Sequence, residues 1–127
     1  MLTITIPAIA PSGNAFYAGM HPMRRRRLAD QWHDLVGWCI RDQQVEPYSL
    51  GYPARIVCRC CFPAGERMLD ADNLFPTAKL IVDSLVRAGV LVNDSPRYIS
   101  SLELIPERTT LPERYTMVTI QPSKESP

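Results

Sequence analysis

Residues 70–89 read DADNLFPTAKLIVDSLVRAG, and this stretch decides how the rest of the chain can be arranged. Its apolar residues recur every three or four positions, which predicts an amphipathic helix with one buried face. Asn73 is a good N-cap for that helix, Pro76 is tolerated in its first turn, and Gly89 ends it. The buried face would consist of Leu74, Ala78, Ile81, Val82 and Leu85.

The segments on either side of this helix predict a small mixed sheet and one more helix. A second amphipathic helix is expected from about residue 23 to residue 43. Alternating or β-prone residues predict strands at 2–6, 54–62, 98–105 and 115–121, the last two joined by 106–112. The predicted order is β-α-β-α-β-β, an α+β fold in which about four strands of a mixed sheet pack with two helices.

Length and composition fit one globular domain over residues 1–121, followed by a polar tail at 122–127. The chain has 127 residues, of which 46% are hydrophobic, enough for a modest core. No segment approaches the roughly 20 apolar residues that span a bilayer, and residues 1–7 are too short and too alternating for a signal peptide. We therefore expect a soluble, cytoplasmic protein without membrane contact.

The four cysteines are too crowded for a disulfide framework. Cys58, Cys60 and Cys61 lie on one predicted strand, where neighbouring side chains point to opposite faces, and no histidine is near enough in sequence to complete a zinc site. Together with Cys39 they are expected to be small buried hydrophobes.

The second half of the chain is acidic although the net charge is +1, because residues 63–127 hold nine Asp/Glu against seven Lys/Arg. In an extended segment Asp70 and Asp72 would point to one side, roughly 7 Å apart, and could share a cation. Asp94, in the loop after the helix, could return toward them. Bound Mg²⁺ would relieve the repulsion among three carboxylates and would suit phosphodiester cleavage. The alternative is that Asp70 and Asp72 only cap the helix.

Several short segments resemble the core signature of RusA-type Holliday junction resolvases. They are Asp70-Ala-Asp-Asn-Leu, Lys79, Asp83-Ser-Leu, Ala88-Gly89 and Asn93-Asp94. The N-terminal Pro11-Ser12-x-Asn14-x-x-Tyr17 resembles the start of that family, and the resemblance extends from about Leu2 to Gln121. It implies a RusA-like fold and a crossover junction endodeoxyribonuclease that depends on Mg²⁺, for which Mn²⁺ can substitute.

The resemblance also implies how such an enzyme would work. A homodimer would resolve four-way DNA junctions by paired symmetric nicks during recombination and repair, in a bacterial or phage-infected bacterial cell. Asp70, Asp72 and Asp94 would hold the metal, and Lys79 would assist catalysis. The alternative for Lys79 is an ion pair with Asp83.

Two positions depart from the family pattern. Lys79 lies six residues beyond Asn73 instead of three, which we attribute to an insertion of Phe75-Pro76-Thr77 that lengthens the loop or the first helical turn. Asn93 stands where many relatives carry an aspartate. Asp83 is expected to be ion-paired, because Lys79 and Arg87 flank it at four residues on either side.

A basic run at the start of the first helix is a candidate DNA-binding segment. Its members are Arg24, Arg25, Arg26 and Arg27. They could neutralise several phosphates without reading sequence, and the alternative is a solvated helix start.

The preceding loop is placed near DNA by the resemblance, through Asn14 and Tyr17. Tyr17 or Phe16 could stack on unpaired bases, or both could pack over the sheet. His21 and His33 are expected to be structural or surface residues, since neither has a metal-ligand neighbour in sequence.

Three hypotheses for function remain open on the sequence. The first is the active resolvase. The second is a protein that binds branched DNA without cutting it, and the third is a nuclease for other flexible or single-stranded substrates. A dimer surface could come from apolar residues of the helix at 74–85 or from an edge strand.

Overall fold

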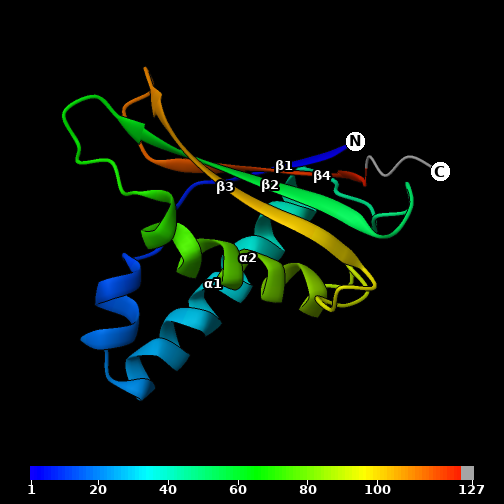
Figure 1. The fold of residues 1–127 in the computed structure, drawn as a ribbon, viewed down its shortest axis with the longest axis horizontal. Helices are drawn as coiled ribbons and strands as arrows, with labels where there is room; N and C mark the ends of the chain where they lie inside the picture. The colour runs from blue at the N-terminus through cyan, green and yellow to red at the C-terminus, as the bar shows by residue number, and fades with distance from the viewer. Residues whose placement is uncertain (124–127) are drawn as a thin grey trace.

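Four strands form one mixed sheet, and both helices lie on the same face of it (Figure 1). The computed structural model describes residues 1–123. Along the sheet the order is β1 (Leu2–Ile6), β4 (Tyr115–Pro122), β2 (Ala54–Pro63) and β3 (Ile99–Thr109). The helical elements are the π-helical turn η1 (Asn14–Ala18), α1 (Pro22–Asp42), the 3₁₀ turn η2 (Ala71–Leu74) and α2 (Phe75–Arg87). The predicted α+β class and element order are confirmed.

Strands β2 and β3, together with α2 between them, form a β-α-β crossover unit. The two strands are parallel neighbours, paired from Ala54 with Ile99 to Pro63 with Thr109. Strand β4 lies antiparallel between β2 and β1. Residues 64–74 therefore follow the carboxyl end of β2, the end at which such units usually present their ligand-binding groups.

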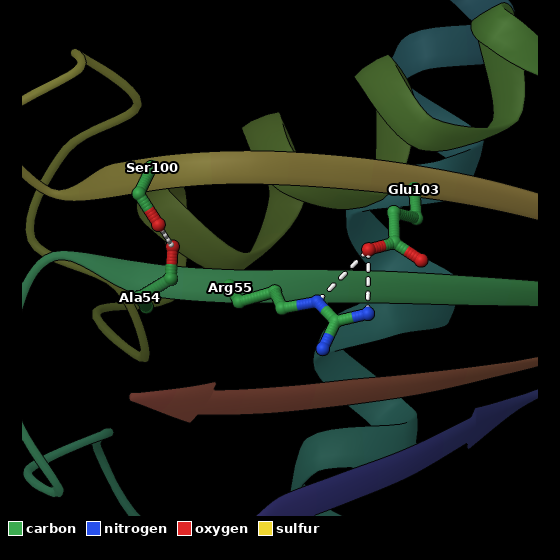
Figure 2. A network of polar contacts seen from close by, with 4 residues as sticks. All are labelled: Ala54, Arg55, Ser100 and Glu103. Atoms are coloured by element: carbon green, nitrogen blue, oxygen red, sulfur yellow. Dashed lines mark hydrogen bonds and ion pairs between the residues drawn. The ribbon is translucent and has the colours of Figure 1, made fainter. Parts of the chain in front are cut away.

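Two ion pairs connect β2 to β3. Arg55 donates from Nε and Nη2 to Oε1 of Glu103, at 2.9 and 2.5 Å (Figure 2). Arg59 donates from Nη1 to Oε1 of Glu107 at 2.7 Å. Because all four side chains are partly exposed, each pair adds at most about 1 kcal/mol, but both favour this parallel register.

The core lies between the sheet and the two helices. The predicted buried face of α2 is confirmed, since its apolar residues are at most 6% exposed. Core side chains from the strands are Ile4, Ile6, Ala54, Ile56, Cys58, Val118 and Ile120. Those from the helices include Trp32, Val36, Cys39, Ala78, Ile81 and Leu85. Within residues 1–123, no helix is long and apolar enough to cross a membrane.

All four cysteines are free and buried, as predicted. Burial raises the pKa of Cys58 to about 12 and that of Cys60 to about 11. A thiol with such a pKa stays protonated at neutral pH and is a poor nucleophile. The cysteines therefore serve as small apolar core residues.

Some element boundaries differ from the prediction. Strand β3 continues through Pro106 to Thr109, where a connection was expected. Proline cannot donate to a ladder, but β3 lies at the edge of the sheet and needs hydrogen bonds on one side only. Strand β4 ends at Pro122, one residue past the expected domain end, and residues 124–127 of the expected tail lie outside the described residues. The turn η1 was not predicted.

The outer edge of β1 is covered by the side chain of Gln43. The N–H of Thr5 donates to Oε1 of Gln43 at 2.9 Å, and Nε2 of Gln43 donates to the carbonyl oxygen of Thr5 at 2.7 Å. Gln43 directly follows α1. The two hydrogen bonds therefore tie the end of α1 to the first strand.

Candidate functional site

The N-terminal loop packs against the acidic segment, although about 60 residues separate them in sequence. A Cβ placed on Gly13 would lie 3.5 Å from Oδ1 of Asn73 and 3.6 Å from the carbonyl oxygen of Asp72. The N–H of Ala10 donates to the buried hydroxyl of Thr77 at 2.9 Å. The fold thus brings together the Pro11–Tyr17 segment and the segment of Asp70–Asn73.

Asp70 and Asp72 are both exposed, and within residues 1–123 neither carboxylate forms a capping hydrogen bond. The backbone of Asp70 is extended, whereas Asp72 lies in the first turn of η2. No side chain caps η2 or α2 through a hydrogen bond. Asp70 therefore occupies the N-cap position of η2 without a capping hydrogen bond from its carboxylate, and the prediction that Asn73 caps the helix is wrong because η2 runs directly into α2. The expected extended geometry holds for Asp70 but not for Asp72.

One face of the η2–α2 segment carries an exposed line of side chains. Asp72, Phe75, Lys79 and Asp83 follow one another at intervals of three or four residues, so they lie on one side of the helix. Nζ of Lys79 lies 3.9 Å from Oδ2 of Asp83, with both side chains about half exposed. The ion pair predicted for Asp83 is confirmed with Lys79 as its partner.

The three residues interpreted as an insertion form the first turn of α2. Pro76 and Thr77 are buried in that turn, whereas Phe75 is 49% exposed. The helix therefore begins earlier relative to Lys79 than the spacing of the family pattern would suggest. Lys79 still projects from the exposed face.

A hollow of about 340 Å³ lies between α2 and β3 and is called here the α2–β3 hollow. It is lined by Phe75, Lys79, Val82, Asp83, Asp94, Ile99, Ser100, Ser101 and Leu102. The fold therefore brings Lys79, Asp83 and Asp94 to one surface depression with apolar walls. Ser100, on the β3 side, donates to the carbonyl oxygen of Ala54 at 3.2 Å (Figure 2).

Asn93, next to Asp94, uses its side-chain oxygen within the loop. Oδ1 of Asn93 accepts a hydrogen bond from the N–H of Ser95 at 2.9 Å. An aspartate could accept the same hydrogen bond. The asparagine thus has a turn-forming contact in this structure.

The carboxylates predicted to bind metal lie in two separate places. Asp70 and Asp72 precede the helix, whereas Asp94 lines the α2–β3 hollow. The rise of the helix puts Asp72 about 10 Å along the axis from Lys79. In the described part of the chain, no three Asp, Glu, His or Cys side chains are grouped closely enough to hold one metal ion. The donors themselves are oxygen ligands of the kind that Mg²⁺ prefers, and one or two carboxylates suffice when substrate phosphates complete the shell.

The four arginines lie in the first turns of α1. His21 caps the helix, with Nδ1 accepting the N–H of Met23 at 3.1 Å. Within residues 1–123, none of the four guanidinium groups lies within 4.0 Å of a carboxylate. Arg24 and Arg27 line a hollow of about 280 Å³, together with Pro11, Met20, Leu28 and Gln31.

The two aromatic residues of η1 have different environments. Phe16 is 8% exposed and belongs to the core, whereas Tyr17 is 48% exposed. Their ring centroids lie 5.0 Å apart in an edge-to-face arrangement. Phe16 therefore packs in the core and is not available to stack on a base. Tyr17 and Asn14 are exposed at the surface.

His33 joins the two helices. Its Nδ1 lies 2.8 Å from Oγ of Ser84, and that hydroxyl donates to the carbonyl oxygen of Leu80 at 2.6 Å. Because the hydroxyl proton is used on Leu80, Nδ1 of His33 carries the proton that it donates to Ser84. The predicted structural role is confirmed for both histidines.

Sequence reasoning missed four of the residues that line these hollows: Gln31 and Met20 beside the arginines, and Ser100 and Ser101 opposite Lys79. Gln31 lies on α1 four residues after Arg27, so helical spacing could have identified it. The other three reach the hollows only through the packing of separate elements, so no local signal could have identified them.

No protein-family model matches the chain, and no curated protein matches it either.

Proposed function

We propose that this protein is a Mg²⁺-dependent, structure-selective endodeoxyribonuclease that resolves four-way DNA junctions as a homodimer. The observation that carries the proposal is the contact of Gly13 with Asp72 and Asn73. The two segments on which the family resemblance rests are distant in sequence, yet they share one surface. A chance likeness of two short motifs would give no reason for such a contact.

The exposed carboxylates of Asp70 and Asp72 would provide the protein ligands for magnesium, and phosphate oxygens of bound DNA would complete its shell. Bound magnesium would supply an activated water and would stabilise charge on the scissile phosphate. Within residues 1–123 neither carboxylate forms a capping hydrogen bond, so both are available to a metal ion.

Lys79 would stabilise the charge that develops on the phosphate. At 3.9 Å its ammonium is too far from Asp83 for a strong direct hydrogen bond, and both groups are half exposed. The ammonium of Lys79 can therefore leave Asp83 and contact a phosphate oxygen with little loss of free energy. Asp83 would act as a positioning residue that keeps the ammonium over the α2–β3 hollow in the free protein.

DNA would be held largely by its phosphates. The guanidinium groups of Arg24 to Arg27, which have no carboxylate partner within 4.0 Å among residues 1–123, supply positive charge on the element that follows the N-terminal loop. A two-fold dimer would present two such sites to a junction that itself has approximate two-fold symmetry. Paired nicks would follow from that symmetry.

A second candidate function is recognition of branched DNA without cleavage. Two observations favour it: the three carboxylates are not grouped around one point, and the side chain of Asn93 is engaged by Ser95. Such a protein would still use the arginines and the N-terminal loop. Magnesium would then alter binding without producing nicks.

The deciding experiment is cleavage of a synthetic four-way junction by wild type and Asp72→Asn, with magnesium and with EDTA. Asp42→Asn is the matched control, because Asp42 is an exposed carboxylate at the opposite end of α1 from the arginines. Paired symmetric nicks that need magnesium and Asp72, but not Asp42, are expected. The non-cleaving alternative would instead be supported if folded wild type bound the four-way junction tightly but produced no nicks in magnesium or manganese.

A further inference from the structure

We propose that the hollow lined by Arg24 and Arg27 binds one unpaired nucleotide of a DNA strand. The hollow has a volume of about 280 Å³ and is called here the arginine hollow. This inference rests on the proposed function, since it assumes that branched DNA is what the protein binds. It adds a way in which the protein would distinguish branched DNA from an intact duplex.

The lining of the arginine hollow has three chemical parts. Pro11, Met20 and Leu28 are partly buried and supply an apolar wall. Gln31 supplies an amide, which both donates and accepts hydrogen bonds. Arg24 and Arg27, three residues apart on one face of α1, supply two cations.

A nucleotide matches those three parts. Its base has a flat face for an apolar or guanidinium surface, an edge that forms hydrogen bonds, and a flanking phosphate that needs a cation. The two guanidinium groups have no carboxylate partner within 4.0 Å among residues 1–123. A phosphate would therefore not have to displace an ion pair.

The arginine hollow lies beside the acidic segment through the N-terminal loop. Pro11 lines the hollow, Ala10 before it is bonded to Thr77, and Gly13 after it contacts Asp72 and Asn73. Tyr17, further along the same loop, is exposed. A strand that leaves the acidic segment along this loop would meet the hollow next.

Only an interrupted duplex can supply such a nucleotide cheaply. Bases within a duplex are paired and stacked, and extracting one requires unpairing and unstacking energy that an already unpaired base largely avoids. The arginine hollow would therefore favour junctions, flaps and gaps over continuous duplex. General phosphate contacts by the other arginines would not discriminate in this way.

The experiment compares two double variants that remove the same charge from the same helix. Arg24→Ala/Arg27→Ala empties the arginine hollow of its cations, whereas Arg25→Ala/Arg26→Ala removes two arginines that do not line it. Gln31→Leu removes the amide without a change of charge. Circular dichroism and thermal unfolding establish that each variant is folded.

Binding would be measured with a single-stranded oligonucleotide that carries 2-aminopurine, with a four-way junction and with a blunt duplex. Arg24→Ala/Arg27→Ala is expected to weaken single-strand and junction binding about tenfold more than duplex binding. It should also remove the fluorescence change of 2-aminopurine, and Gln31→Leu should reduce that change. Arg25→Ala/Arg26→Ala is expected to weaken binding to all three DNAs to a similar degree.

Equal losses for the two double variants on every DNA would overturn the assignment of the arginine hollow. Cleavage separates this failure from failure of the proposed function. If wild type nicks junctions but both double variants bind single strands as well as wild type does, only the assignment of the arginine hollow is refuted. A wild type that binds single strands through Arg24 and Arg27 but never nicks would refute the nuclease alone.

Discussion

The hydroxyl of Thr77 accepts a 2.9 Å hydrogen bond from the backbone N–H of Ala10, and both residues are buried. This contact fixes the N-terminal loop to the first turn of α2, the turn that follows the acidic segment. Because the loop also contacts Asn73 through Gly13, the relative position of the two candidate segments depends on it.

Thr77→Val should leave the N–H of Ala10 buried without an acceptor. We expect the free energy of unfolding to fall by about 1–3 kcal/mol, the usual cost of an unsatisfied buried group. Amide hydrogen exchange at Ala10 should become much faster in Thr77→Val and stay slow in Thr77→Ser, which keeps the hydroxyl. Unchanged protection of Ala10 in the valine variant would contradict the role given to this hydrogen bond.

Lys79→Ala should abolish cleavage with little effect on stability. The Lys79–Asp83 pair is half exposed, and pairs of this kind contribute about 0.5 kcal/mol or less. Asp83→Asn breaks the same pair but keeps the ammonium, so it should retain most of the cleavage rate. Equal loss of cleavage in both variants would mean that cleavage depends on the Lys79–Asp83 ion pair and not on the free ammonium of Lys79.

Magnesium should raise the melting temperature of wild type through Asp70 and Asp72. At ten times its dissociation constant, a ligand that binds only the native state adds about 1.4 kcal/mol. Asp70→Asn/Asp72→Asn should lose this shift, and without magnesium it should be at least as stable as wild type because one source of like-charge repulsion is gone. Asp30→Asn/Asp34→Asn, which alters two exposed aspartates of α1, should keep the shift. A shift that survives in Asp70→Asn/Asp72→Asn would place the ion elsewhere.

The buried thiols predict a loss of stability in alkaline solution. Burial raises the pKa of Cys58 and Cys60 from the ordinary 9.0 to about 12 and about 11, so the native state holds these protons more tightly than the unfolded state. Their contribution to stability is complete below pH 9 and is lost as the pH rises toward those values. Urea unfolding at several pH values between 8 and 11 would measure this slope. Cys58→Ala/Cys60→Ala should be less stable at every pH but show a shallower slope.

Sequence periodicity predicted both helices and the alternating strands, because each of these has an apolar side that the period reveals. Strand β2 is buried on both faces and was predicted from its β-prone residues instead. The buried face of α2 and the inward residues of the strands could be read in this way. The end of β3 could not, because whether Pro106 is tolerated depends on the strand lying at a sheet edge. The preference of Asn73 for a cap was overridden because η2 continues directly into α2.

The candidate site was harder to predict than the fold, because it is assembled from separate elements. The spacing of Lys79 and Asp83 gave their ion pair directly, since helical neighbours follow from sequence. That Asp94 would share a hollow with them depends on the parallel pairing of β2 with β3. The roles of Asp70, Asp72 and Asp94 in metal binding stay a prediction.

The side chain of Gln43 imitates the peptide group of a fifth strand, since it both donates to and accepts from Thr5. Further growth of the sheet at β1 is therefore blocked by the protein's own amide. At the other edge β3 runs through Pro106, which offers no N–H to a neighbouring strand. A second copy that joins by strand addition at β3 would therefore meet a missing hydrogen bond at Pro106, which disfavours both orderly dimers and unwanted aggregates along this edge.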